Sequence, residues 1–193
     1  MQLLKDRISR DAQVLPGGVI KVSSFLNHMI DTALAKEIAV EFARRFQGTG
    51  VTKVLTIEAS GIAFAVLVGV ELGVPVVFAK KTAGSNTAGD SAWSTTVRSY
   101  TKGTECTVQV SRQYLTPDDR VLIVDDFLAY GEAVAGLGDL VRRSGGTLCG
   151  AGIVIEKAYE PGGAKLREAG IRVESLARIS SIEGGVIRFS ESV

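Results

Sequence analysis

Nearly continuous apolar segments alternate with helix-like segments through the middle of the chain, and this alternation constrains its fold more than any other feature. Four segments read as strands: residues 51–59, 74–81, 121–126 and 147–158. Residues 60–73, between the first two of these strands, and residues 131–145, between the last two, show helical spacing of apolar residues and end on glycine. Strands that are apolar on both sides need cover on both faces, which helical crossovers supply. The sequence therefore predicts an α/β fold whose central, mostly parallel sheet is flanked by helices.

The segments outside this alternation can be placed more coarsely. They comprise an amphipathic helix in the first ten residues, a Pro-Gly-Gly break at 16–18, a part-extended segment at 19–31, a helix over about 32–47 capped by Asp31, two strands within 94–112 around Lys102-Gly103, a short helix at 161–170 and a last long strand at 171–179. Residues 82–93 are polar and glycine-rich, and long loops of this kind often act as lids. A chain of 193 residues suits a single domain.

The balance of charges restricts the partners of the chain. Its 22 Lys and Arg and 21 Asp and Glu residues nearly cancel, which argues against broad binding to nucleic acid or to a membrane surface. The apolar runs are too short to cross a bilayer, and the N-terminus is charged rather than signal-like. Two distant cysteines, Cys106 and Cys149, form no metal or disulfide pattern, and the single histidine, His28, stands in no triad-like spacing. We therefore expect a cytoplasmic protein.

Two adjacent carboxylates, Asp125 and Asp126, end the apolar run VLIV, and a short bridge and Gly131 precede the next helix. In open α/β sheets, ligands bind beyond the carboxyl ends of the strands, where this pair is expected. Carboxylates accept hydrogen bonds from sugar hydroxyls or face a hydrated Mg²⁺, and backbone amides at a loop-to-helix junction hold anions. Together these features describe a site for a ribose 5-phosphate. The alternative is an acidic pair at a strand end that only caps the next helix.

The segment VLIVDDFLAYGEAV, residues 121–134, resembles the 5-phosphoribosyl 1-pyrophosphate (PRPP) signature of type I phosphoribosyltransferases. The resemblance implies that Asp125 and Asp126 are the catalytic acids and orient the ribose hydroxyls. It implies Mg²⁺ as a cofactor that arrives with PRPP, with no firmly built metal site in the protein. It also assigns the 5-phosphate to the loop made of Ala129, Tyr130, Gly131, Glu132 and Ala133.

Two further segments resemble the parts of this family that hold pyrophosphate. Ser60 and Gly61, in TIEASGIAFA, match the pyrophosphate loop, where the family often has a non-proline cis bond, expected here at Ala59–Ser60. Taken alone, Ser60-Gly61 is also an ordinary helix N-cap. Lys80 and Lys81 match a basic pair at a strand end, one of which faces pyrophosphate, although strand-end lysines are commonly solvated.

The segments KVSSFLNHMID, LGVPVVFAKK, GIVIEKAYEPG and RVESLARI resemble the bacterial xanthine branch of this family over nearly the whole chain. The likeness implies a base pocket made of Ile20, Asn27 and Lys157. Lys157 would donate to the 6-oxo group, Asn27 would donate its amide to the 2-oxo group of xanthine, and Ile20 would form an apolar wall. A solvated lysine and a turn asparagine are the ordinary alternatives. Guanine or hypoxanthine remains possible, and Asn27 is the discriminating residue.

Two positions depart from the family pattern. Glu132 puts a negative charge at the helix N-terminus that would receive a phosphate; it suits the helix dipole but would repel the ligand unless it points away. Lys80 stands where an arginine is common, so a point charge replaces a bidentate fork.

The family fold adds a hood made from the N-terminal segment and C-terminal elements, with the loop at 82–93 closing over PRPP. We expect one domain with a hood over about 1–36, a core over about 37–160 and C-terminal elements over about 161–193. The resemblance implies a homodimer that converts xanthine and PRPP to xanthosine 5′-phosphate and pyrophosphate in purine salvage. A PRPP-sensing regulator and a bare dinucleotide-binding domain are weaker alternatives, because no separate DNA-binding segment precedes the core and no GxGxxG follows its first strand.

Overall fold

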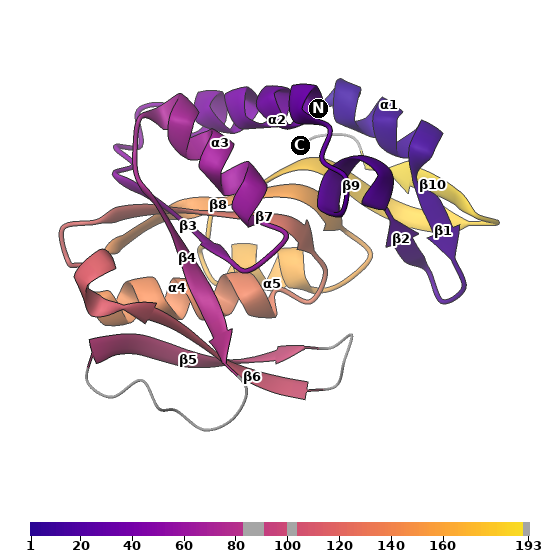
Figure 1. Cartoon of the computed structure of the whole chain (residues 1–193). Helices are drawn as coiled ribbons and strands as arrows, with labels where there is room; N and C mark the ends of the chain where they lie inside the picture. The colour runs from indigo at the N-terminus through magenta and orange to yellow at the C-terminus, as the bar shows by residue number, and fades with distance from the viewer. Residues whose placement is uncertain (83–90, 100–103, 191–193) are drawn as a thin grey trace.

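The computed structural model describes residues 1–82, 91–99 and 104–190, and in these ranges the central sheet has eight strands in the order β10-β9-β8-β7-β3-β4-β6-β5 (Figure 1). Their bounds are β3 (Lys53–Ile57), β4 (Val76–Thr82), β5 (Ala92–Ser99), β6 (Thr104–Ser111), β7 (Arg120–Leu128), β8 (Thr147–Lys157), β9 (Val173–Glu183) and β10 (Val186–Phe189). The strands β4, β3, β7, β8 and β9 run parallel, and antiparallel pairing at each side adds β6, β5 and β10. The predicted α/β fold is confirmed.

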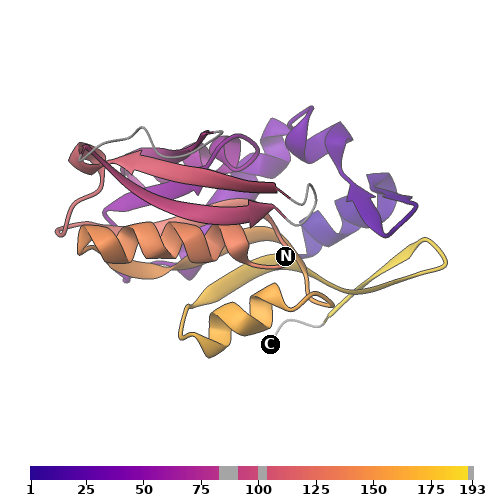
Figure 2. The same cartoon turned by 90° about the horizontal axis from the view of Figure 1, so that it is seen from below.

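Helices cover both faces of the sheet, as its doubly apolar strands require (Figures 1 and 2). On one face lie α2 (Thr32–Arg45) and α3 (Ile62–Leu72), and on the other lie α4 (Glu132–Ser144) and α5 (Gly162–Glu168). Phe42 and Phe64 pack against Leu122 in the first core layer, whereas Leu137 packs with Ile123 in the second. The central strand β7 therefore buries side chains in both layers.

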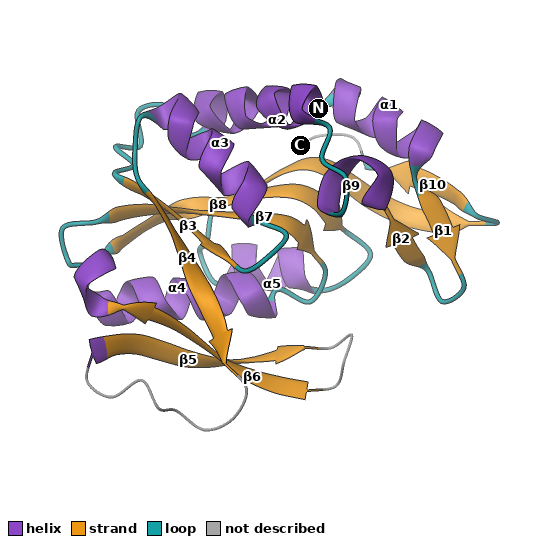
Figure 3. Ribbon diagram, in the orientation of Figure 1, coloured by secondary structure: helices purple, strands orange, loops and turns teal. Residues whose placement is uncertain are grey.

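The N-terminal elements lie beside the C-terminal strands, as Figure 3 shows. They are α1 (Gln2–Asp11), a hairpin of β1 (Gln13–Leu15) and β2 (Val19–Lys21), and a π-helical turn at Ser23–Asn27. Helix α1 contacts both β9 and β10. Asp31 caps α2 as predicted, since its carboxylate accepts a 3.1 Å hydrogen bond from the amide of Leu34.

Several boundaries differ from the prediction. The antiparallel pair β5–β6 was predicted within 94–112, but β5 begins at Ala92 and β4 includes Thr82, so the expected loop at 82–93 is shortened at both ends. Of its remaining residues, 83–90 lie outside the described residues, as does the turn at Lys102-Gly103. The sequence prediction also missed β1, β2 and β10, which are three- or four-residue strands with little periodicity. No helix in the described ranges is long and apolar enough to span a membrane.

Candidate active site

Asp125 and Asp126 lie on β7, the strand between β3 and β8, and both side chains are buried. The prediction that they end the strand is wrong. Pairing with β8 continues through Phe127 opposite Ile155 and Leu128 opposite Glu156, because apolar residues still fill the core beyond the acids. The two carboxylates therefore lie within a strand and are held more rigidly than loop residues would be.

The two acids have different local partners. The Ser60 hydroxyl donates a 2.9 Å hydrogen bond to Asp126, and the Asp126 amide donates to the Asp125 carboxylate at 3.0 Å. Burial, and then the charge of Asp126, raise the pKa of Asp125 well above its usual value, and the charge of Lys81 opposes this rise. Asp125 is thus a buried acid that receives one backbone amide hydrogen bond, and a bound cation or hydroxyl donor would further stabilise its ionised form.

The turn from β3 to α3 approaches the acids directly. Its cis peptide bond is Glu58–Ala59, one residue before the Ala59–Ser60 bond that was predicted. Gly61 precedes α3, and a Cβ atom there would lie 2.3 Å from the Thr56 hydroxyl and 2.9 Å from an Asp125 carboxylate oxygen. Glycine is needed because the backbone passes so close to Asp125. The structure therefore brings Ser60 and Gly61 to the two acids.

The two lysines of β4 lie on opposite sides of the strand, since neighbouring strand residues alternate. Lys81 acts on the Asp125 carboxyl through its charge, and its amide donates a 2.7 Å hydrogen bond to Glu58. Lys80 instead lines a cavity of about 510 Å³ together with Phe78 and Tyr114. The structure brings Lys81, and not Lys80, toward the acids.

The loop at 129–133 leads into α4, whose first residue is Glu132. Gly131 has a φ of +86°, a left-handed conformation that a side chain would strain. The first amides of α4 have no partner within the helix and are available to an anion. Glu132 lines a cavity of about 610 Å³ between α4 and α5, together with Lys165. Glu132 therefore lies at the α4–α5 cavity, beside Tyr130 and Gly131 of the same loop.

The three predicted base residues come from distant segments. Ile20, on β2, is buried in the same core layer as Ile155 and Ile179. Lys157 is the last residue of β8 and pairs with Ile179 of β9. Because Ile20 and Ile179 belong to the same core layer, Ile20 helps to support the strand end that carries Lys157. Asn27 ends the π-helical turn and is exposed, and its carboxamide has no hydrogen-bond partner within the described part of the chain.

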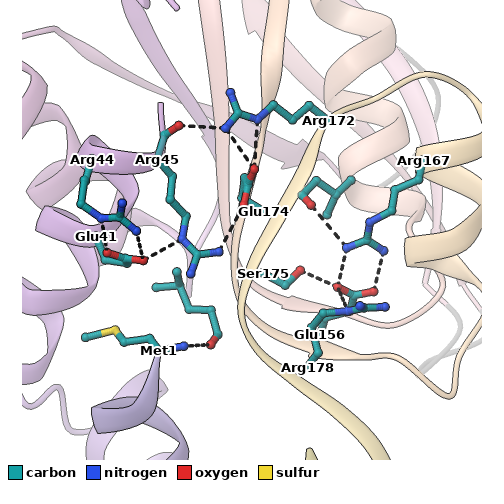
Figure 4. A network of polar contacts seen from close by, with 12 residues as sticks. Met1, Glu41, Arg44, Arg45, Glu156, Arg167, Arg172, Glu174, Ser175 and Arg178 are labelled. Atoms are coloured by element: carbon teal, nitrogen blue, oxygen red, sulfur yellow. Dashed lines mark hydrogen bonds and ion pairs between the residues drawn. The ribbon is translucent and has the colours of Figure 1, made fainter. Parts of the chain in front are cut away.

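Glu156 is the buried polar residue that sequence reasoning missed (Figure 4). Arg167 donates to both of its oxygens at 2.8 Å, Ser175 donates at 2.5 Å, and Arg178 lies 3.2 Å away as an ion pair. Burial opposes ionisation of Glu156, but these partners outweigh it and lower its pKa. The signal in the sequence was a single acid inside the apolar run GIVIEK.

The donor chemistry fits a magnesium ion that is carried by a ligand. Carboxylate oxygens are hard ligands of the kind Mg²⁺ prefers, and it usually retains several waters and binds through one or two carboxylates plus phosphates. Among the described residues, no three His, Cys, Asp or Glu side chains converge in a way that could hold a metal alone. Asp125 and Asp126 can therefore contribute to such a site only together with a ligand.

Comparison with known proteins adds the following findings. The phosphoribosyl transferase domain model matches residues 21–176. Xanthine phosphoribosyltransferase of Stutzerimonas stutzeri is 52% identical over 98% of this chain and 99% of its own length. The protein of the same name from Moorella thermoacetica is 51% identical over 98% of this chain and 96% of its own length.

Solved structures show the same fold at much lower identity. Adenine phosphoribosyltransferase of Giardia lamblia, in complex with 9-deazaadenine, is 22% identical and superposes with a TM-score of 0.74 over 92% of this chain and 98% of its own. The adenine enzyme of Rhodothermus marinus gives 0.73 at 22% identity over 93% of this chain and the whole of its own.

Proposed function

The chain belongs to the phosphoribosyl transferase domain family, and on that premise we propose that it converts xanthine and PRPP to xanthosine 5′-phosphate and pyrophosphate in purine salvage. The observation that carries this proposal is the 52% identity, over nearly the full length of both chains, to a protein named xanthine phosphoribosyltransferase. The site supports it as well, because buried acids, a glycine turn and a helix N-terminus lie along the carboxyl edge of one sheet.

In this proposal the protein acts mainly by positioning and electrostatics. Asp126, oriented by Ser60, and Asp125 accept hydrogen bonds from the ribose hydroxyls. As the bond from C1′ to pyrophosphate breaks, its electrons leave with pyrophosphate, and the base nitrogen forms the new bond to C1′ and loses its proton to the departing pyrophosphate or to water. Positive charge develops on the ribose during this exchange, and the two carboxylates stabilise it.

The pyrophosphate and the 5-phosphate are held mostly by backbone. We assign pyrophosphate to the Ser60-Gly61 turn and to Lys81, which the structure places on the same side as the acids. Lys80, on the other side of β4, is the weaker candidate. The 5-phosphate is assigned to the amides of 129–133, with Glu132 lining the cavity beside α5. Magnesium, when bound with PRPP, would neutralise pyrophosphate charge, with Asp125 and Asp126 as its protein-side acceptors, directly or through water.

The base assignment rests on Ile20, Asn27 and Lys157. An unpartnered carboxamide at Asn27 can donate to the 2-oxo group of xanthine, which hypoxanthine lacks and guanine replaces with an amine. Steady-state rates on xanthine, guanine and hypoxanthine test this assignment. We expect xanthine to have the highest kcat/KM by at least about tenfold, since a polar group that is left without a partner once the base is bound discriminates strongly. Equal rates on guanine would reject it.

We also propose a homodimer that buries the outer face of α3. The helix is apolar at every position except Glu71, and Val66 and Val70 are exposed on it at 46% and 69%. A second copy of the chain would cover this face. In light scattering with size exclusion, Val70→Glu should give monomers, whereas Val186→Glu, at an exposed valine on β10, should stay dimeric. A dimer unaffected by Val70→Glu would place the interface elsewhere.

The remaining expectations belong to the same proposal. We propose a cytoplasmic setting, with Cys106 and Cys149 supporting it as free thiols. We also keep the division into a hood at about 1–36, a core at about 37–160 and C-terminal elements at about 161–193. The contacts of α1 with β9 and β10 support a hood built from both ends of the chain.

A further inference from the structure

Glu156 connects three elements through one buried carboxylate. It lies on β8 directly before Lys157, and it is bound by Arg167 of α5 and by Ser175 and Arg178 of β9. Figure 4 shows these side chains converging on Glu156. Arg167 also donates to the Val173 carbonyl at 3.3 Å, so its guanidinium is fixed on two sides. A bidentate guanidinium–carboxylate pair fixes both distance and orientation.

Helix α5 depends on this anchor. It has seven residues, and helices that short are not stable by themselves. Gly163, in its first turn, faces the anchor: a Cβ atom there would lie 2.1 Å from a Glu156 oxygen and 2.7 Å from the Arg167 guanidinium. The Glu156–Arg167 pair therefore occupies the space directly beside the start of α5.

The neighbouring glycine contacts the loop assigned to the 5-phosphate. The Gly162 amide donates a 2.9 Å hydrogen bond to the Ala129 carbonyl. A Cβ atom at Gly162 would lie 2.4 Å from that carbonyl and 2.4 Å from the Gly131 amide nitrogen. Two consecutive glycines of one short helix thus contact the carboxylate of Glu156 on one side and the backbone of the loop on the other.

We propose that Glu156 is a positioning residue that sets the 5-phosphate loop through Arg167 and α5, while its own strand end presents Lys157. The inference rests on the proposed function, because it takes 129–133 as the loop that holds the 5-phosphate. One buried side chain then fixes the separation between the phosphate end and the base end of the substrates. Displacement of the loop by a fraction of an ångström would weaken phosphate binding without removing any group that touches it.

The test compares Glu156→Gln with Glu174→Gln. Glu174 is a carboxylate on β9 that pairs with Arg45 and Arg172 and makes no hydrogen bond to α5 among the described residues. Ribose 5-phosphate binding is measured by calorimetry, together with thermal unfolding, kcat and the KM for PRPP. We expect Glu156→Gln to weaken ribose 5-phosphate binding and raise the KM for PRPP by about tenfold or more, with a smaller change in kcat. Glu174→Gln should leave both unchanged.

A second variant covers the case in which Glu156→Gln does not fold. Arg167→Lys keeps the positive charge but loses the bidentate fork. It should therefore raise the KM for PRPP in the same direction as Glu156→Gln, but by a smaller factor. Unchanged ribose 5-phosphate binding in a folded Glu156→Gln or Arg167→Lys protein would overturn the inference, even if the melting temperature falls. Because ribose 5-phosphate lacks a base, a wrong base assignment would leave this result intact. A wild-type protein that does not bind ribose 5-phosphate would reject the proposed function as well.

Discussion

Two buried carboxylate sites on neighbouring strands solve the same electrostatic problem in opposite ways. On β7, Asp125 is buried beside a second acid, and burial and that neighbour raise its pKa. On β8, Glu156 is buried to a similar degree, but an arginine fork, a serine hydroxyl and a second arginine lower its pKa. The difference shows which site is more completely paired: among the described residues, Glu156 has two arginines and a serine as partners, whereas Asp125 accepts one backbone hydrogen bond and lies beside a second acid.

The comparison predicts opposite responses to pH. The pKa of Asp125 is raised on folding, so its contribution to stability is present at low pH and is lost as pH rises through the folded value. The pKa of Glu156 is lowered on folding, so its contribution is present above about pH 4.5 and is lost as pH falls below that value.

The largest effect is expected when Glu156 loses its fork. Arg167→Ala leaves a buried carboxylate with one remaining arginine, and the free energy of unfolding should fall by about 3 kcal/mol. The control is Arg188→Ala, which breaks an exposed ion pair with Glu183 and should cost less than about 1 kcal/mol. Urea unfolding at pH 7 measures both. Equal losses in the two variants would show that Glu156 is not a special site.

The next effect concerns catalysis at the less completely paired site. Asp126→Asn keeps the shape and the contact with Ser60 but removes the negative charge that faces the ribose in the proposed mechanism, and kcat should fall by about 10²–10³-fold. Asp118→Asn, at an exposed acid before β7, should leave kcat unchanged. Assays at saturating PRPP and xanthine measure both. A fall of less than threefold in Asp126→Asn would remove that acid from the mechanism.

A smaller effect of opposite sign is expected for stability at Asp125. Asp125→Asn removes a charge that is costly to bury, so the free energy of unfolding should rise by about 1 kcal/mol at pH 7.5 even though activity is lost. The gain should shrink toward pH 3.5, where the wild-type carboxyl is protonated in the folded state and mostly protonated in the unfolded state. Melting curves across this range measure the slope. A loss of stability at pH 7.5 would mean that Asp125 is satisfied in the free protein.

The smallest effect tests a third carboxylate. Glu132 begins α4, and Glu132→Gln should lower the free energy of unfolding by about 0.5 kcal/mol through the helix dipole. Glu132 lines the cavity beside α5, and we expect its side chain to point into that cavity, so the KM for PRPP should change by less than about threefold. Thermal unfolding and PRPP titrations check the two values. A large improvement in PRPP binding would show that Glu132 repels the phosphate.

The sequence predicted the parts of the molecule that depend on local pattern. Apolar runs and helical spacing placed the sheet, Asp31 placed a helix start, and Gly61 and Gly131 marked turns where the backbone needs space or a left-handed conformation. These properties belong to single residues and their near neighbours, so the edge of the sheet that carries Asp125 and Asp126 could be predicted as well.

The remaining features depend on residues that meet only in the folded chain. Glu156 acquires its partners from Arg167 and Ser175, 11 and 19 residues further along the chain, and no local pattern reports that meeting. Lys80 and Lys81 could not be told apart, because the face that each side chain takes follows from the register of β4. The continuation of β7 beyond the acids likewise depends on its pairing with β8.

The hydrogen bond from Gly162 to Ala129 has a consequence for engineering the base specificity. Between Lys157 and Gly162 the chain has four residues, Ala158, Tyr159, Glu160 and Pro161, and both ends of that segment are fixed by backbone contacts. Libraries that seek new bases should therefore vary the identity of these four residues and keep their number. An insertion there would change the length of chain between Ala158, which is hydrogen-bonded to Ile179, and Gly162, which is hydrogen-bonded to Ala129. It would therefore shift the proposed phosphate loop along with the proposed base contacts.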